Sequence, residues 1–201
     1  MTTARDARTA VPLHPLLASR WSTRAFDPAA ELTAGQVTAL LEAARWSPSA
    51  SNTQPWRFAV ALRGTPGHDA LLGTLAPGNR AWADTASALV LVAAVTTGPD
   101  GAERPWAVYD AGQAVAHLTV QAEHEGLAVH QLGGFDRDAA ARLLPAEAGT
   151  PLVVLAVGRH DAALQLAEPF ASRETAPRTR LPLEEIEVPL TTGSAAAHRA
   201  A

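Results

Sequence analysis

The chain of 201 residues contains no cysteine and no lysine. Without cysteine there can be no disulfide framework, thiolate metal site, catalytic thiol or CxxC redox pair. Without lysine there can be no Schiff-base catalysis through a lysine amine and no phosphate loop that relies on one. All sixteen basic residues are therefore arginine. The sequence also lacks an apolar run near the ~20 residues that a membrane helix requires, so we expect no membrane span.

The net charge of −4 and the absence of a basic run argue against nucleic acid as a partner. The first fifteen residues have no long apolar core, so we expect no secretory signal and a cytoplasmic protein. A composition rich in alanine and arginine is associated with bacterial genomes of high GC content. The length fits one domain that needs no structural metal to fold.

Hydrophobic periodicity predicts a mixture of helices and strands. A capping box at Thr33 and Gln36 opens one helix, which must end before Pro48. A long helix carries an apolar face formed by Val108, Ala111, Val115, Leu118 and Ala122, and Gly126 is placed to end it. Shorter helices are expected at 13–20, 67–76 and 136–144, and strands at 56–62, 88–95, 127–132 and 151–158. These elements together predict one layer of sheet between layers of helices.

The ends of the chain differ in character from the middle. Residues 1–11 are polar and aperiodic, so we expect a disordered N-terminus. Residues 12–190 form the expected domain, in which 160–190 make an arm with isolated apolar anchors. Residues 191–201 are expected to be a flexible tail.

Familiar catalytic templates are missing. No GxGxxG follows a strand, no GxSxG is present, and the seven histidines show no metal-ligand spacing. His117 and His124 share a helix face, but surface or packing roles are favoured over metal binding, and no metal site is expected. His130, beside a pair of glycines, is best interpreted as a hydrogen-bonded structural histidine.

Three segments carry polar groups suited to a ligand. Arg20 and Arg24 flank Ser22 in RWSTR, where two guanidinium groups can fork onto a phosphate, although a solvated helix end is the plainer interpretation. Residues 47–56 (SPSASNTQPW) form a polar loop fixed by two prolines, suited to a heteroaromatic ring or simply to joining a helix to a strand. Residues 133–136 (GGFD) let main-chain N–H groups approach a ligand, or make an ordinary turn with Asp136 as the next N-cap.

In this order, the segments resemble the nitroreductase family of FMN-dependent NAD(P)H oxidoreductases. The resemblance rests on residues 20–58, with R-x-S-x-[RK]-x-F, a helix, and P-S-x-x-N-x-Q-P-W. Weaker matches extend it over about 12–188. It implies an α+β three-layer sandwich, with a central mixed, mainly antiparallel sheet between helices and a C-terminal arm exchanged in a homodimer.

The resemblance also implies cofactor contacts position by position. The residues that would bind the FMN phosphate and pyrimidine edge are Arg20, Trp21, Ser22 and Arg24. Two arginines near the C-terminal end of the resemblance, Arg178 and Arg180, would also bind the phosphate. The partner subunit's loop reaches the isoalloxazine through Pro48, Ser49, Ala50 and Asn52. Asn79 and Leu132 lie near the ring, and the main chain of Gly133 and Gly134 addresses flavin N5 and O4. No catalytic side chain is implied, because flavin N5 carries the hydride.

Two positions depart from the family's pattern. Trp82 stands roughly where some members have a lysine near the pyrimidine, so that contact must differ. Gly133 stands where some members have a glutamate, which reshapes the substrate side. The helical insertion that covers the substrate in larger members is expected to be reduced to residues 96–106.

The implied activity is hydride transfer from NADH or NADPH, through the flavin, to a nitroaromatic, quinone or similar small-molecule acceptor by a ping-pong mechanism. Two alternatives remain open. One is a specialised member that matures a natural product or consumes flavin. The other is a flavin-binding protein without catalysis. The sequence chooses neither the acceptor nor between NADH and NADPH.

Overall fold

A computed structural model describes residues 7–190. The expected tail at 191–201 lies outside the described residues, as does most of the expected disordered N-terminus; residues 7–11 form no helix or strand. Within the described range, no helix is both long and apolar enough to cross a membrane.

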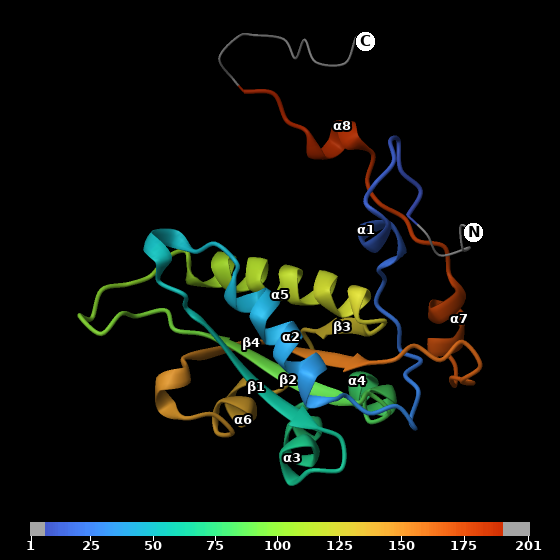
Figure 1. The fold of residues 1–201 in the computed structure, drawn as a ribbon, viewed down its shortest axis with the longest axis horizontal. Coiled ribbons are helices and arrows are strands. Elements are labelled where there is room, and N and C mark those ends of the chain that lie inside the picture. Colours follow the sequence, from blue (N-terminus) through green and yellow to red (C-terminus); the bar gives the residue numbers. More distant parts are fainter. Residues whose placement is uncertain (1–6, 191–201) are drawn as a thin grey trace.

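The centre of the fold is a sheet of four strands, and its order decides which parts of the chain can meet. The strands are β1 (Trp56–Leu62), β2 (Ala88–Ala94), β3 (Ala128–Leu132) and β4 (Thr150–Gly158), close to their predicted bounds. They lie in the order β1-β2-β4-β3, and each pairing is antiparallel. The expected mainly antiparallel sheet is confirmed, without a parallel pair among the described strands. β1 and β3 are therefore the two edges (Figure 1).

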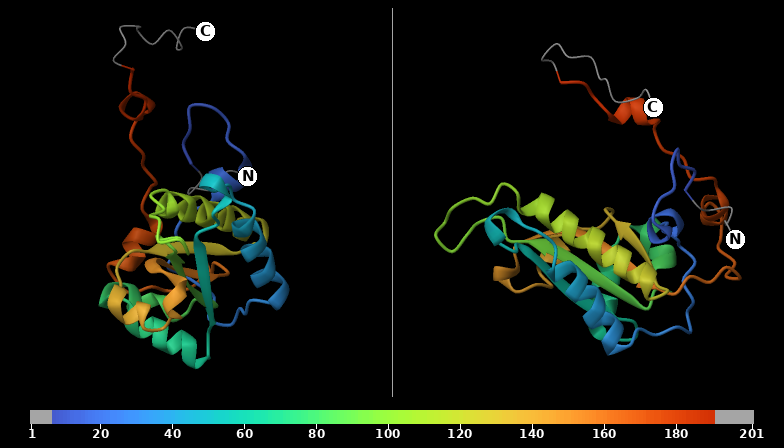
Figure 2. Two further views of the ribbon diagram at one scale, coloured as in Figure 1. Left: turned by 90° about the vertical axis from the view of Figure 1, so that its left-hand side faces the viewer. Right: turned by 45° about the horizontal axis from the view of Figure 1, so that its top comes forward.

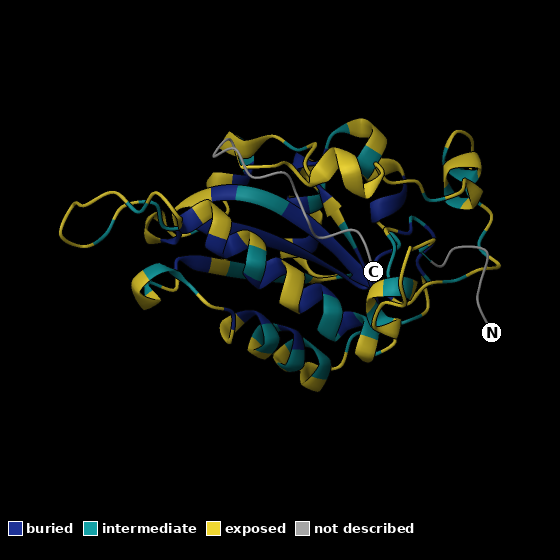
Figure 3. Ribbon diagram, turned by 90° about the horizontal axis from the view of Figure 1, so that it is seen from above, coloured by how far each residue is buried: buried dark blue, intermediate teal, exposed yellow. Residues whose placement is uncertain are grey.

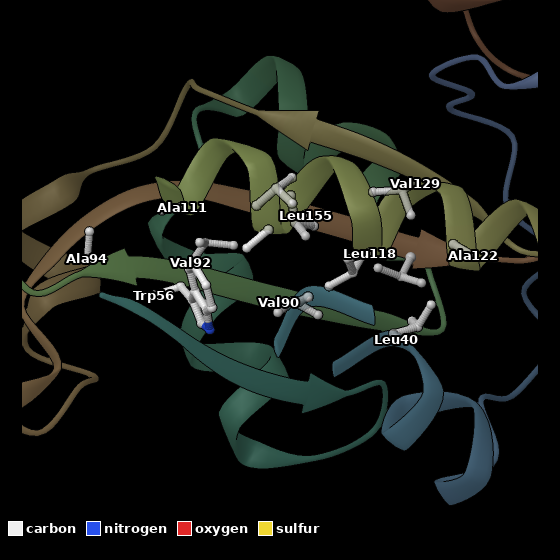
Figure 4. Packing of buried hydrophobic residues seen from close by; sticks show 14 of the residues in the cluster. Leu40, Trp56, Val90, Val92, Ala94, Ala111, Leu118, Ala122, Val129 and Leu155 are labelled. Atoms are coloured by element: carbon white, nitrogen blue, oxygen red, sulfur yellow. The ribbon is translucent and has the colours of Figure 1, made fainter. Parts of the chain in front are cut away.

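The unbroken apolar run of β2 is explained by burial on both faces of the sheet. Alternate side chains of a strand point to opposite faces. Val90 and Val92 join the hydrophobic cluster under one helical layer, shown in Figure 4, whereas Leu89 and Leu91 join the cluster under the other. All seven residues of β2 are buried, so this strand links two cores.

One face of the sheet is covered by α2 (Ala34–Arg45) and α5 (Ala107–His124). The predicted capping box is confirmed: the Gln36 N–H donates to Thr33 Oγ1, and the Thr33 N–H donates to Gln36 Oε1, each at 3.1 Å. Gly126 follows α5 with φ of 71°, which favours glycine. The predicted face of α5 is wrong at Val108, which is exposed, because Ala107 takes the buried place in the first turn.

The other face is covered by α3 (Pro66–Thr74), α4 (Pro77–Ala83) and α6 (Arg137–Ala141), and short 3₁₀ turns occupy Ala50–Asn52 and Ala146–Ala148. The sequence analysis did not predict α4. Pro77 at its first position is a usual helix start, but the helix is too short to show periodicity. Residues 96–106, where the sequence predicts a reduced insertion, form a loop that projects beyond the sheet (Figure 1).

The arm begins after β4 and leaves the body of the molecule. It contains α7 (Phe170–Thr175), which lies on the same side as α1 (Pro15–Ser19), and then α8 (Leu183–Ile186), which stands away from the sheet in both views of Figure 2. Of the predicted apolar anchors, Leu164, Leu166 and Phe170 are half-buried. The distal apolar side chains remain exposed, as the yellow arm of Figure 3 shows: Leu181, Leu183, Ile186, Val188 and Leu190.

Candidate functional site

Arginines from the two ends of the chain gather beside α1. Arg20 follows α1 and is half-buried, and burial lowers the pKa of its guanidinium, with Arg178 and Arg180 adding repulsion and Glu123 opposing it. Arg178 Nη1 donates to the Ala18 carbonyl at 2.9 Å. Like charges brought together in this way raise the local positive potential and favour an anion between them.

Arg24 extends this group of arginines toward the sheet. Its guanidinium lies 5.8 Å from the ring centroid of Trp82, a cation–π contact. Between the two arginines, the exposed Ser22 accepts a hydrogen bond from Arg20 Nη1 at 3.5 Å, and the Trp21 ring packs edge-on against His160.

We call Arg20, Arg24, Arg178 and Arg180 the arginine cluster. Two carboxylates lie among them: Glu123, which opposes the repulsion on Arg20, and Glu174, which accepts the Arg24 N–H. These two carboxylates offset only part of the positive charge of the four guanidinium groups, so a surplus of positive charge remains among these residues. That surplus suits a phosphate monoester, whose own charge is about −1.5 to −2 at pH 7.

His130 lies between the arginine cluster and the sheet as a neutral side chain. Its Nδ1 is 2.8 Å from the Thr23 carbonyl oxygen, so Nδ1 carries the proton and donates. Its ring packs on Trp82 with centroids 4.6 Å apart. Burial lowers the pKa of His130 to about 4, and Arg24 contributes in the same direction, against the Thr23 hydrogen bond. The predicted hydrogen-bonded structural histidine is confirmed.

The paired glycines lie at the far end of β3. The Gly134 carbonyl accepts from the Asn79 side-chain amide and from the Ala76 N–H, each at 3.0 Å. A Cβ on Gly134 would come within 3.0 Å of Asn79 Nδ2, whereas one on Gly133 would meet nothing within 4 Å. Gly133 therefore borders open space, and Leu132 before it is buried.

Asn79 and Trp82 connect this turn to the arginine cluster, because both lie on α4. Asn79 binds Gly134, and Trp82, one turn later, contacts both His130 and Arg24. The predicted phosphate residues and the predicted turn therefore lie along one edge of the sheet, beside β3. Asp136 caps α6 by accepting the Ala139 N–H at 2.9 Å, as predicted.

The polar loop before β1 is held in an unusual backbone conformation. Ser51, Asn52 and Gln54 have φ of 50°, 55° and 44°, values that non-glycine residues rarely adopt. The Ala50 N–H donates to the buried Asp110 carboxylate at 3.0 Å, and the Gln54 N–H donates to Ser49 Oγ at 3.1 Å. Strained, over-determined loops of this kind cluster at ligand sites. Pro48, ahead of it, is exposed.

Within one chain, this loop lies far from the arginine cluster. The loop leads into β1, one edge of the sheet, and the arginine cluster adjoins β3, the other edge; three strand spacings of ~4.8 Å separate them, roughly 14 Å. The two also lie at opposite ends of α5: the loop binds Asp110, and Arg20 lies near Glu123, about 20 Å away along the helix axis. One chain does not bring both halves of the predicted site together.

Some side chains singled out in the sequence lie outside this region. His117 Nδ1 is 2.8 Å from Ser47 Oγ, and His124 is exposed. Among residues 7–190, no three histidine or acidic side chains form a group that could hold a metal ion. Also outside this region, Arg57 and Arg104 line a cleft of about 570 Å³.

Sequence reasoning missed Glu174 and Thr23, which hold the Arg20–Arg24 segment through buried hydrogen bonds. Glu174 lies about 150 residues from its partners and in no motif, so no local signal could have found it. Thr23 lies inside the RWSTR motif, but the motif gives no role to the position between Ser22 and Arg24. The sequence therefore did not indicate that Thr23 supports the segment.

Comparison with known proteins identifies relatives of the chain. The model of the nitroreductase family matches residues 17–159. An uncharacterized 15.4-kDa protein of Mycolicibacterium smegmatis is 38% identical over 138 residues, covering 65% of this chain and 92% of that protein. A Bacillus subtilis protein, provisionally named as an NAD(P)H nitroreductase, is 25% identical over 182 residues, covering 72% of this chain and 86% of its own.

Solved structures resemble the whole described fold. A crystal structure of an oxidoreductase containing FMN is 31% identical, with a TM-score of 0.85, and covers 94% of this chain and 96% of that one. A Desulfovibrio desulfuricans protein, solved in complex with FMN, is 26% identical, with a TM-score of 0.67, and covers 89% of this chain and 99% of that one.

The buried neutral histidine predicts a specific pH dependence of stability. The pKa of His130 is lowered to about 4 in the folded chain, from 6.5, so the unfolded chain binds a proton that the folded chain refuses between these values. The free energy of unfolding should therefore fall as the pH is lowered from 6.5 to 4. His130→Asn, whose amide can still donate to the Thr23 carbonyl, should remove about 1–2 kcal/mol of the fall between pH 7 and pH 5.

Urea unfolding at a series of pH values measures this effect. His124→Asn supplies the matched control, because it removes one imidazole from an exposed position on α5. Identical pH profiles for the wild-type protein and His130→Asn would show that His130 does not carry the buried neutral imidazole assigned to it.

Proposed function

This chain belongs to the nitroreductase family, and we propose that it is an FMN-dependent oxidoreductase that takes hydride from NADH or NADPH. The observation that carries the proposal is the positively charged arginine cluster, placed beside the open Gly133 turn along the β3 edge. A phosphate-bearing planar cofactor fits that arrangement of charge at one end and main-chain groups at the other.

The residues present fit FMN in its two parts. The arginine cluster would bind the phosphate, and Ser22 and Trp21 lie in the same segment. Gly133 and Gly134 would present main-chain groups to the isoalloxazine N5 and O4 edge, with Asn79 and Leu132 supporting that turn. Trp82, where some members have lysine, contacts Arg24 and His130 instead, so we assign it to support of this wall.

FMN supplies the hydride-carrying chemistry when bound, so no side chain need act as a nucleophile or metal ligand. The chain's own residues would bind the phosphate, hold the ring edge at the Gly133 turn and leave one ring face open. We propose that the electron donor and then the acceptor, a nitroaromatic, quinone or similar small molecule, use that face in turn. The FMN-containing relative at 31% identity supports the cofactor.

We propose that the working unit is a homodimer. The Pro48, Ser49, Ala50 and Asn52 loop lies too far from its own arginine cluster to share a flavin, and a second copy would supply it. The arm supports the same conclusion, because Leu183, Ile186 and Val188 are more than half exposed in one chain and have apolar surface to bury against another. We also propose the division of the chain into a domain at 12–190, with the arm at 160–190, and a tail at 191–201.

The proposed enzyme acts on small molecules, without nucleic acid or a membrane, and we place it in the cytoplasm of a bacterium, where NADH and NADPH are present. The relatives from Mycolicibacterium smegmatis and Bacillus subtilis are both bacterial proteins. The alternatives are a specialised family member, which product analysis would reveal, and a flavin-binding protein without catalysis.

The activity itself is the first test. The purified protein, incubated with FMN and desalted, should retain about one flavin per chain, and anaerobic NADH or NADPH should bleach its absorbance. Because one ring face serves both substrates, initial rates against donor and quinone should give parallel reciprocal lines. Retained FMN that neither nucleotide bleaches would favour the non-catalytic alternative, and intersecting lines would contradict alternate use of one face.

The arginine cluster predicts which part of the cofactor each variant affects. Arg24→Ala and Arg180→Ala each remove one charged hydrogen bond to the phosphate, and should weaken FMN binding about ten- to a hundred-fold. Riboflavin lacks the phosphate, so its dissociation constant should change much less. Quenching of flavin fluorescence measures both ligands, and Arg142→Ala, an exposed arginine after α6, is the control. Equal weakening of FMN and riboflavin would mean that these arginines support the ring or the fold.

A shared site predicts complementation between two defective chains. Arg24→Ala damages the arginine cluster, and Asn52→Gly removes an amide from the loop while permitting the positive φ. Each homodimer has two damaged sites, but a mixed dimer has one site with both lesions and one intact site, so about half of the sites in purified mixed dimers should recover. Co-expression with two affinity tags, followed by flavin counting, measures this recovery. No recovery in purified mixed dimers would place the whole site within one chain.

A further inference from the structure

One carboxylate joins the arm to the predicted phosphate-binding segment. Glu174, on α7, accepts a hydrogen bond from the Thr23 hydroxyl through Oε1 and from the Arg24 N–H, at 3.0 Å, through Oε2. Its side chain is only 12% exposed. The Glu174 carboxylate thus uses both oxygens on adjacent donors of a segment some 150 residues away.

Thr23 is held from its other side as well. Its carbonyl accepts from His130, and its hydroxyl oxygen accepts the Ala25 N–H at 2.9 Å. Thr23 is completely buried. The main chain at Thr23 and Arg24 is therefore fixed between β3 and α7, and the Arg24 side chain leaves this fixed point toward Trp82.

The charge of Glu174 is unfavourable for the role of its neighbours. A carboxylate beside Arg24 lowers the positive potential that a bound phosphate would experience. Its contribution is then geometric, because without it the Arg24 N–H would lose its acceptor and the buried Thr23 hydroxyl would keep only the longer contact, 3.4 Å, with the Ala25 carbonyl. A neutral side chain at position 174 that cannot accept from both the Thr23 hydroxyl and the Arg24 N–H would leave one of these two donors without Glu174's hydrogen bond.

The arm delivers the other half of the arginine cluster. Arg178 and Arg180 follow Glu174 within six residues, and Arg178 binds the Ala18 carbonyl at 2.9 Å. These two arginines therefore approach Arg20 from a segment that Glu174 holds only four and six residues earlier. Docking of α7 brings the two halves of the arginine cluster together.

We propose that Glu174 is a positioning residue that couples binding of the FMN phosphate to docking of the arm. The inference rests on the proposed function for its ligand. Thermodynamic linkage makes the coupling reciprocal: a phosphate held by arginines from both ends of the chain stabilises the docked arm, and a docked arm raises the affinity for that phosphate.

The sign of one substitution separates positioning from charge. Glu174→Gln keeps the shape but replaces an accepting oxygen with an amide NH₂, which opposes the Thr23 or Arg24 donor. We expect about tenfold or greater weakening of FMN, with riboflavin changed less than about twofold. If the carboxylate acted through its charge, its removal would tighten FMN binding instead. Tighter FMN binding, or equal weakening of FMN and riboflavin, would overturn the assignment.

Glu185→Gln is the matched control, because it removes the same charge from an exposed position on the same arm. It should bind FMN and riboflavin as the wild-type protein does. Glu174→Asp, which restores a carboxylate on a shorter side chain, should recover part of the FMN affinity. No recovery relative to Glu174→Gln, with a wild-type melting temperature, would contradict an acceptor role.

Tryptic cleavage of the protein without flavin reads the arm directly. Trypsin cleaves after arginine, and mass spectrometry resolves cuts at Arg173, Arg178 and Arg180. Glu174→Gln should be cut there several-fold faster than the wild-type protein or Glu185→Gln. FMN should protect the wild-type arm, and riboflavin should not. Equal cleavage rates for the wild-type protein and Glu174→Gln would overturn the coupling. A wild-type protein that binds no FMN would overturn the proposed function, and the cleavage rates would then still test whether Glu174 holds α7 in place.

Discussion

A four-stranded sheet covered by helices on both faces leaves only its edges and ends for a ligand. β2 and β4 occupy the middle; β2 is buried along its whole length and β4 from Val154 to Gly158, so these parts present no side chain to a cofactor. The polar groups capable of binding are pushed outward to β3 on one edge and to the loop before β1 on the other. The distance between these edges, set by strand spacing, is the constraint behind our proposal that a second copy of the chain completes the site.

The electrostatics of the β3 edge depend on one neutral group among many charged ones. Arg24, Glu174 and Arg20 lie near His130, whose imidazole stays unprotonated because burial opposes its charge. A protonated imidazole there would add a further positive charge beside the two arginines. As a neutral donor, His130 holds the Thr23 carbonyl in place without adding charge to the arginine cluster that we propose binds a phosphate.

Local patterns in the sequence predicted the local parts of the fold. The apolar run at 88–95 and the capping box at Thr33 specify their elements through contacts within one segment, so they were predicted closely. α4 was missed because seven residues around Gly78 offer no periodicity. The motif identified Arg20 and Arg24, but their supports Glu174 and His130 act on main-chain atoms across more than a hundred residues, and no spacing rule reports such contacts.

The position of Arg178 and Arg180 after the last strand of the sheet has a consequence for the order of synthesis. The sheet is complete once β4 has left the ribosome, while the arm is still being made or lies within the exit tunnel. The body can therefore form before the arm brings its two arginines to Arg20. On the proposed assignment, a polypeptide interrupted between β4 and Arg178 would keep the strands of the sheet and lose half of the arginine cluster, so retention of FMN would report that the arm is present.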